Sequence, residues 1–216
     1  MTSRARRSLV LCYHAVSPTW EHRLSIHPDL VLGQVRALCR LRKVRASFDD
    51  GFRSAAAVFP ELQRLGVPIE LFVSTGYARN GAPFRIPELA PDDPAQLATM
   101  TWDELRGHAD RGVEIGSHTV SHPHLSTLSD DEVRRELCDS KEEIEAELGL
   151  PCPDFAYPYG EHDQRVRGAV RAAGYEQAYA LQDAPRNDRF ALRRLDLYRR
   201  HTPLRAVLRA TPLGRL

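Results

Sequence analysis

Short apolar runs alternate along the chain with longer segments that carry helical spacing. The apolar runs lie at residues 44–48, 69–73, 113–115 and 155–157, and the helical segments lie at residues 55–65, 130–148 and 163–173. Short strand-like runs that are separated by helices and brief connections predict parallel strands with the helices packed outside. The pattern therefore indicates an α/β fold, built either as an open sheet or as a barrel.

The expected helices carry start and stop signals. Thr101 and Ser129 are each followed three residues later by a glutamate, which is the Ser/Thr-x-x-Glu pattern of a capping box. The stop signal is a glycine, which readily takes the left-handed conformation of a helix C-cap. These glycines are Gly66, Gly149 and Gly174.

Length and composition limit the classes of protein that the chain can belong to. It has 216 residues, 42% of them hydrophobic and 27% charged, with a formal net charge of +1. This near-neutral balance gives no global attraction to nucleic acid, and no apolar run approaches the ~20 residues of a membrane-spanning helix. We expect a single domain over residues 1–216, with a core at about 8–198 and a basic C-terminal segment at 199–216.

The N-terminal residues and the cysteines bear on localisation. Arg4, Arg6 and Arg7 precede an apolar stretch that stops after five residues, which is shorter than the ~7–15 residues of a signal-peptide core. Four cysteines are present without a Cys-x-x-Cys pair. This pattern favours reduced thiols and a cytoplasmic protein.

The last part of the chain is strongly basic. Residues 186–216 contain nine arginines against two aspartates, Asp188 and Asp196. A solvated outer helix is the simpler interpretation. The alternative is a patch that contacts an anionic substrate or the anionic surface of a membrane.

Two adjacent carboxylates, Asp49 and Asp50, follow the strand expected at residues 44–48. Each carboxylate raises the pKa of the other unless a cation is near. A bound divalent metal would take one of them as a ligand and leave the other as a base. Without further evidence, an Asp-Asp-Gly sequence is more often a simple turn.

A histidine pair follows the strand expected at residues 113–115. His118 and His122 are four residues apart, so one helical turn would place both imidazoles on the same face. Neutral imidazoles suit Zn²⁺ and its neighbours in the transition series. His124 breaks this spacing and is expected to be a loop residue.

An aromatic and proline-rich turn, residues 155–160, follows the last of the expected strands. Such a turn is stiff, so its backbone N–H groups have fixed directions and could stabilise an oxyanion. A packed turn is the alternative. Taken together, the three segments predict an Asp and His₂ metal site, with Asp49 as the base that deprotonates a water. The third segment, with Tyr157, Pro158 and Tyr159 as substrate-binding residues, would supply backbone donors and an aromatic wall for a sugar ring.

The three segments, in this order, resemble the motifs of the polysaccharide deacetylases, carbohydrate esterase family four. The resemblance runs from about residue 11 to residue 197, and the opening Tyr13-His14 is similar to that of the poly-N-acetylglucosamine deacetylase branch. Members of this family remove acetyl groups from N-acetylated sugars such as chitin. The resemblance implies a distorted (β/α) barrel with about seven parallel strands.

The resemblance also implies a role for each motif residue. Asp49 would be the base, and the backbone N–H of Tyr159 would help to form the oxyanion hole. The implied metal ligands are Asp50, His118 and His122. The expected ion is Zn²⁺, although Co²⁺, Ni²⁺ or Fe²⁺ would also suit such a site.

The sequence departs from the family pattern at two functional positions. Many members have an arginine in the third motif that pairs with the base, and this chain has Ala156 there. Arg194 resembles a late arginine that takes this role in the branch that lacks the first one. The C-terminal Leu-x-His motif is also missing, so His14 is the candidate general acid. The structural alternative for His14 is a buried histidine that bonds to a neighbouring loop.

We therefore expect a metal-dependent hydrolase that removes the acetyl group from an N-acetylated carbohydrate. One alternative is a non-catalytic carbohydrate-binding module on the same fold, in which the two departures from the family pattern reflect a loss of catalytic activity. The other is a hydrolase of a small-molecule amide.

Overall fold

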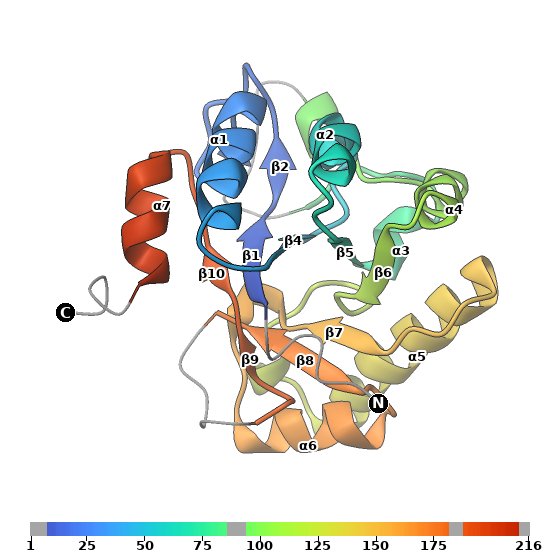
Figure 1. Cartoon of the computed structure of the whole chain (residues 1–216). Coiled ribbons are helices and arrows are strands. Elements are labelled where there is room, and N and C mark those ends of the chain that lie inside the picture. The colour runs from blue at the N-terminus through green and yellow to red at the C-terminus, as the bar shows by residue number, and fades with distance from the viewer. Residues whose placement is uncertain (1–7, 86–93, 182–187, 212–216) are drawn as a thin grey trace.

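The computed structural model describes residues 8–85, 94–181 and 188–211 (Figure 1). Its centre is an eight-stranded parallel sheet with the order β10-β1-β4-β5-β6-β7-β8-β9. The strands are β1 Leu9–Tyr13, β4 Val44–Phe48, β5 Ile69–Val73, β6 Glu114–Ser117, β7 Asp154–Ala156, β8 Gln177–Ala180, β9 Leu192–Arg193 and β10 Leu195–Asp196. A separate parallel pair joins β2 (Ala15–Val16) to β3 (Ser25–Ile26).

The last strand segment turns this sheet into a nearly closed barrel. β9 pairs with β8, while β10 pairs with β1, and only Arg194 separates the two strands in the chain. The predicted (β/α) barrel is therefore confirmed. The strand count is eight, against an expectation of about seven, because the closing segment is divided into two short strands at Arg194.

Helices surround the barrel (Figure 1). The α-helices are α1 Pro28–Cys39, α2 Phe59–Arg64, α3 Thr75–Ala78, α4 Trp102–Asp110, α5 Asp130–Leu148, α6 Gln164–Ala172 and α7 Pro203–Ala210. The 3₁₀ turns are η2 Arg53–Val58, η3 Pro94–Leu97, η4 Leu125–Thr127 and η5 Pro158–Gly160. In the part of the chain that is described, none of the helices combines the length and the apolar character needed to cross a membrane.

The predicted helix signals act where the sequence places them. Both capping boxes are formed, at Thr101 before α4 and at Ser129 before α5, and α5 ends at Gly149 with a φ of 64°. The helix expected at residues 55–65 differs, since it is a 3₁₀ segment followed by α2. Pro60 lies in the first turn of α2, where the absence of a backbone N–H costs nothing, and it favours a helix start there.

Alternate residues of the strands face opposite sides. One set packs against the helices and forms the main core, as Leu11, Leu71 and Phe155 do. The other set faces the barrel interior, where Phe72 and Tyr179 form an apolar middle layer. Polar side chains lie above and below this layer, at the carboxyl and the amino ends of the strands.

The basic C-terminal segment contributes a helix to the outside of the barrel. α7 lies beside α1 (Figure 1), where a Cβ on Gly33 would lie 3.3 Å from the Pro203 ring. Ala206 is buried, whereas Leu204 and Leu208 are exposed. The predicted outer helix is present, and residues 212–216 of the segment lie outside the described residues.

Candidate active site

The predicted site residues come together at the carboxyl ends of the strands. The positions that follow or separate the strands are His14 after β1, Asp49 and Asp50 after β4, His118 and His122 after β6, Tyr159 after β7, and Arg194 between β9 and β10. Parallel strands of a barrel end at the same rim, so segments far apart in the sequence meet there.

Asp50 and the two histidines form a compact donor set. Asp50 Oδ1 lies 3.5 Å from His118 Nε2 and 3.3 Å from His122 Nε2. Zinc bonds of 2.0–2.1 Å in a tetrahedron place neighbouring ligand atoms about 3.3 Å apart, so these separations fit a shared ion. His118 Nδ1 contacts the carbonyl oxygen of Ala156 at 2.7 Å, which leaves Nε2 as the nitrogen available to a metal.

The histidines do not share a helical turn, so that part of the prediction is wrong. They lie in the loop after β6, where Thr119 and His122 have φ values of 71° and 60°. The Thr119 hydroxyl accepts a hydrogen bond from the His122 N–H at 2.9 Å and supports this left-handed turn. Tertiary loop geometry, and not helix periodicity, brings the two rings together.

The electrostatics of this donor set favour a cation. Burial, and then the charge of Asp49, raise the pKa of Asp50 well above its ordinary value. Asp50 Oδ1 is buried and has no hydrogen-bond partner among the described residues. Burial also lowers the pKa of both histidines, that of His122 to about 2. Two neutral imidazoles and a buried carboxylate oxygen without a donor fit a divalent metal ion.

Asp49 is held by a buried arginine. Arg194 Nη1 donates to Asp49 Oδ1 at 2.6 Å and Nη2 donates to Oδ2 at 2.7 Å. Burial alone would raise the pKa of Asp49, but the groups around it, the Arg194 guanidinium first among them, together outweigh this and hold the pKa below its ordinary value. The carboxylate is therefore ionised. The late arginine is thus placed as the sequence predicts, in contact with the expected base.

Two further residues support this pair. The Cys12 thiol donates to Asp49 Oδ2 at 3.3 Å, and the Ser47 hydroxyl accepts a hydrogen bond from Arg194 Nη1 at 3.1 Å. The sequence analysis does not assign either residue to the site. Strand alternation is a signal that could have found them, because residue 47 shares a face with residue 49, and residue 12 shares a face with residue 14.

His14 lies beside the same carboxylate. One of its ring nitrogens, Cys12 Sγ and a carboxylate oxygen of Asp49 all lie within 4.8 Å of one another. The ring is half-buried, and burial lowers its pKa to about 4, so the imidazole is neutral near pH 7. The structure therefore brings His14 to the expected base.

The aromatic turn presents one ring to the site. Tyr159 is 39% exposed and lies edge-on to His122, with ring centroids 4.6 Å apart. Tyr157 and Pro158 are buried, and the Tyr157 hydroxyl donates to the carbonyl of Phe190 at 2.7 Å. The Tyr157 ring belongs to the core, so an aromatic wall at this place consists of Tyr159.

His124 adds a neighbour that the sequence analysis leaves outside the site. Its ring stacks on Tyr159 with centroids 3.8 Å apart and planes at 7°. It also contacts Glu161, with 2.9 Å between His124 Nδ1 and Glu161 Oε2. Nothing in the local sequence pattern indicates this stacking, which depends on how two separate loops meet.

Comparison with known proteins supports the same family. YxkH of Bacillus subtilis (strain 168) is 23% identical over 143 residues, which are 64% of this chain and 44% of that protein. Chitin deacetylase 1 of Cryptococcus neoformans var. grubii serotype A is 40% identical over 63 residues, which are 29% of this chain and 13% of that protein. The matched part thus spans less than half of each of these curated relatives.

A solved structure shares the fold. The Streptococcus pyogenes deacetylase PplD, determined in complex with acetate, superposes with a TM-score of 0.80 at 19% identity, and the match covers 95% of this chain and 99% of that one. The polysaccharide deacetylase family model matches residues 40–178, which include all three motif segments. The chain belongs to the polysaccharide deacetylase family.

Proposed function

We propose that the protein is a metal-dependent deacetylase that hydrolyses the N-acetyl group of an amino sugar. The observation that carries this proposal is the metal-type donor set of Asp50, His118 and His122 next to an ionised carboxylate, Asp49. Family membership and the likeness to a chitin deacetylase support the class of substrate. When bound, a divalent ion such as Zn²⁺ would polarise the amide carbonyl and lower the pKa of a water molecule.

Asp49 accepts the proton of the attacking water. The two hydrogen bonds from Arg194 fix the direction of its carboxylate and keep it ionised. The same hydrogen bonds make Asp49 a weaker base. A carboxylate with a lowered pKa accepts a proton only from a water molecule whose own pKa is lowered. Arg194 is therefore a positioning residue that sets the orientation and the strength of the base.

His14 returns the proton to the departing amine. Because its imidazole is neutral near pH 7, it must receive a proton during the reaction, and the carboxylate of Asp49 is the nearby source. We assign the backbone N–H of Tyr159 to the developing oxyanion. Its ring, which flanks His122, forms one wall for the sugar. The products are acetate and the free amino sugar.

The test is acetate release from N-acetylglucosamine polymers, oligomers and nucleotide-linked sugars. Zinc-loaded protein should release acetate, and chelator-treated protein should release it only after the metal is restored. The matched variant Asp49→Asn should keep its zinc by elemental analysis and lose turnover by about 10²–10⁴-fold. Full activity in that variant would refute the role of Asp49.

The same panel separates the two alternatives. A carbohydrate-binding module would retain the oligomers without releasing acetate. A hydrolase of small-molecule amides would cleave simple N-acetyl compounds and leave the sugars intact. Either result would overturn the proposed substrate.

A further inference from the structure

The loop that presents the two imidazoles has a backbone conformation that its own residues do not favour. We call residues 118–122 the ligand loop. Thr119 and His122 have φ values of 71° and 60°, in the left-handed region that residues other than glycine rarely adopt. Thr119 is β-branched, which makes this conformation less favourable still. Such a backbone persists only where surrounding contacts hold it, so the contacts of the ligand loop determine whether the two imidazoles face the same point.

One side of the ligand loop is bound to the start of α3. The N–H of Thr75 donates to the carbonyl oxygen of Thr119 at 3.1 Å, and the N–H of Gly76 donates to that of Val120 at 2.9 Å. A Cβ on Gly76 would lie 2.9 Å from the Val120 carbonyl oxygen, so the two chain segments are in close contact. These main-chain bonds fix carbonyl groups of the ligand loop, and its N–H groups need other partners.

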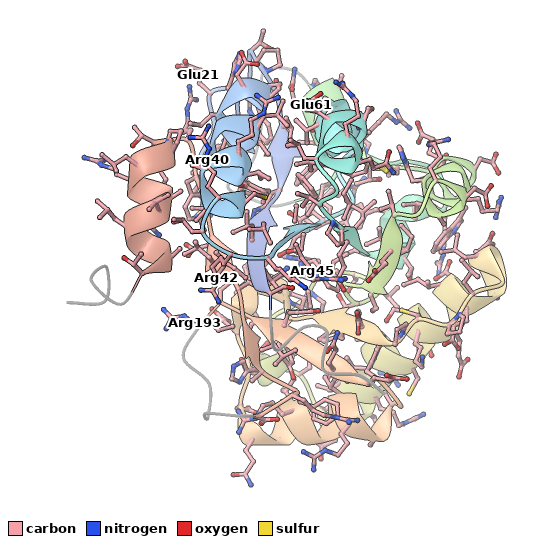
Figure 2. The ribbon with its side chains drawn as sticks, in the orientation of Figure 1. Glu21, Arg40, Arg42, Arg45, Glu61 and Arg193 are labelled. Carbon is pink, nitrogen blue, oxygen red and sulfur yellow. The ribbon has the colours of Figure 1, made fainter. Side chains whose placement is uncertain are left out.

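The Glu136 side chain binds the other side of the ligand loop. Glu136 lies on α5, which runs along the outside of the barrel next to β6 (Figure 2). Its Oε2 accepts hydrogen bonds from the N–H groups of Val120 and Ser121 at 2.8 and 3.0 Å. Its Oε1 accepts a hydrogen bond from the Ser121 hydroxyl at 2.6 Å. Both carboxylate oxygens are therefore bonded to the ligand loop, and the charge makes such bonds about twice as strong as neutral ones.

We propose that Glu136 is a positioning residue, which holds the ligand loop in the conformation that metal binding requires. This role rests on the proposed function, because the metal site belongs to it. Without the Glu136 carboxylate, the N–H groups of Val120 and Ser121 would bond to water, and the ligand loop would relax out of the left-handed region. The two imidazoles would then leave their shared position beside Asp50. Part of the binding free energy of the metal would be used to restore the loop, which weakens binding.

The first experiment measures the zinc affinity of the full chain by competition with a chromophoric chelator. Glu136→Ala should bind zinc about tenfold more weakly or worse, and the visible absorption spectrum of its Co²⁺-loaded form should differ from that of wild type. Glu136→Gln should restore the affinity to within about threefold. Its amide oxygen can accept both N–H groups, and the Ser121 hydroxyl can accept from its NH₂ group. An equal loss of affinity in Glu136→Gln and Glu136→Ala would overturn the proposal.

Glu145→Ala is the matched control. Glu145 also lies on α5, and its Oε1 accepts a hydrogen bond from the N–H of Cys152 at 3.0 Å, so this variant releases a different loop from the same helix. Like Glu136→Ala, it should lower the free energy of unfolding in urea, but it should change the zinc affinity by less than about twofold. Equal zinc affinities in the two variants would mean that Glu136 only stabilises the fold, which overturns the proposal.

Amide hydrogen exchange of the metal-free protein separates this inference from the proposed function. The N–H groups of Val120 and Ser121 should exchange faster in Glu136→Ala than in wild type, because their acceptor is gone. If the wild-type chain binds no zinc, the proposed function fails, and the exchange rates alone decide whether Glu136 holds the ligand loop. Faster exchange in the variant supports that role, and equal exchange rates in the two proteins overturn it.

Discussion

The two ends of the barrel interior make an informative comparison. At the carboxyl end, Asp49 and Asp50 lie with three histidines and Arg194. At the amino end, three acidic side chains lie with one arginine, and these residues are Glu70, Glu114, Asp154 and Arg45. The three carboxylates have oxygen atoms within 4.8 Å of one another, as do the three donors of the proposed metal site. The apolar layer of Phe72 and Tyr179 separates the two ends.

The ends differ in how their charge is neutralised. At the carboxyl end, Arg194 binds both oxygens of Asp49, so Asp50 is left to the two imidazoles. At the amino end no histidine is present among the described groups, and Arg45 binds the half-exposed Glu114 more closely than Glu70. Burial, and then the charge of Asp154, raise the pKa of Glu70 well above its ordinary value. One end thus suits a cation, and the other retains protons.

The largest predicted effect is the loss of stability on replacing Arg194, compared with the loss on replacing Arg45. Arg194→Ala leaves the ionised Asp49 buried without its partner, which should cost about 3–5 kcal/mol in the free energy of unfolding. Arg45→Ala should cost clearly less, because Glu70 is already inclined to hold a proton and Glu114 reaches solvent. Urea unfolding of both variants checks this ordering. Equal costs would show that Glu70 is ionised and depends on Arg45.

The second prediction concerns metal binding. Zinc at about 100 times its dissociation constant should stabilise the protein by about 2.7 kcal/mol, since it binds only the folded chain. His122→Ala should abolish this stabilisation, and Glu70→Gln should leave it unchanged. Thermal melting with and without zinc measures the effect. Stabilisation by Mg²⁺ that disappears in Glu70→Gln would break the comparison, because it would make the amino end a second cation site.

The sequence predicts parallel strands with outer helices and the meeting of the motifs for a clear physical reason, whereas the choice of a barrel over an open sheet comes from the family resemblance. Strand and helix periodicities reveal the alternation, and the carboxyl ends of parallel strands share one rim, so Asp49 and His118 are expected to be neighbours. The loop that joins His118 to His122 could not be predicted, because its left-handed turn depends on a hydrogen bond that the Thr119 hydroxyl accepts from the His122 N–H. A two-residue strand such as β9 is too short to show any periodicity.

Other parts of the site depend on packing that no local pattern records. Tyr157 and Tyr159 look equivalent in the sequence, yet one is in the core and the other faces the histidines. The sequence does not indicate the amino-end cluster either, because Glu70 is a single charge within an apolar strand. Its partners come from three other strands, β4, β6 and β7, and the side-by-side position of these strands and β5 in the sheet brings them together.

The third prediction is a pH dependence that distinguishes the ends. The folded chain retains the proton of Glu70 at pH values where the unfolded chain has lost it. The contribution of this bound proton to the free energy of unfolding is therefore complete below the unfolded pKa, and it is lost as the pH rises toward the folded pKa. The loss has a slope of at most about 1.4 kcal/mol per pH unit. Glu70→Gln should remove it.

Unfolding in urea across the range from acid to alkaline pH, in zinc-loaded protein, measures the difference between Glu70→Gln and wild type. The variant should gain relative stability as the pH rises. Asp50 is present in both proteins, so its own contribution cancels in this difference. A difference that stays flat with pH would mean that folding does not raise the pKa of Glu70.

The smallest predicted effect concerns the thiol beside the base. Burial raises the pKa of Cys12 well above its ordinary value, so it remains a thiol and donates weakly to Asp49 Oδ2, an oxygen that also accepts from Arg194. Cys12→Ala should therefore lower kcat/KM by only about two- to threefold, at the low end of a single hydrogen bond. Cys12→Ser, which keeps a donor, should restore the rate. An equal loss of kcat/KM in Cys12→Ala and in Arg194→Ala would contradict this prediction. The orientation of Asp49 would then depend on the whole set of donors around it, and Arg194 alone would not account for the difference between the two ends of the barrel.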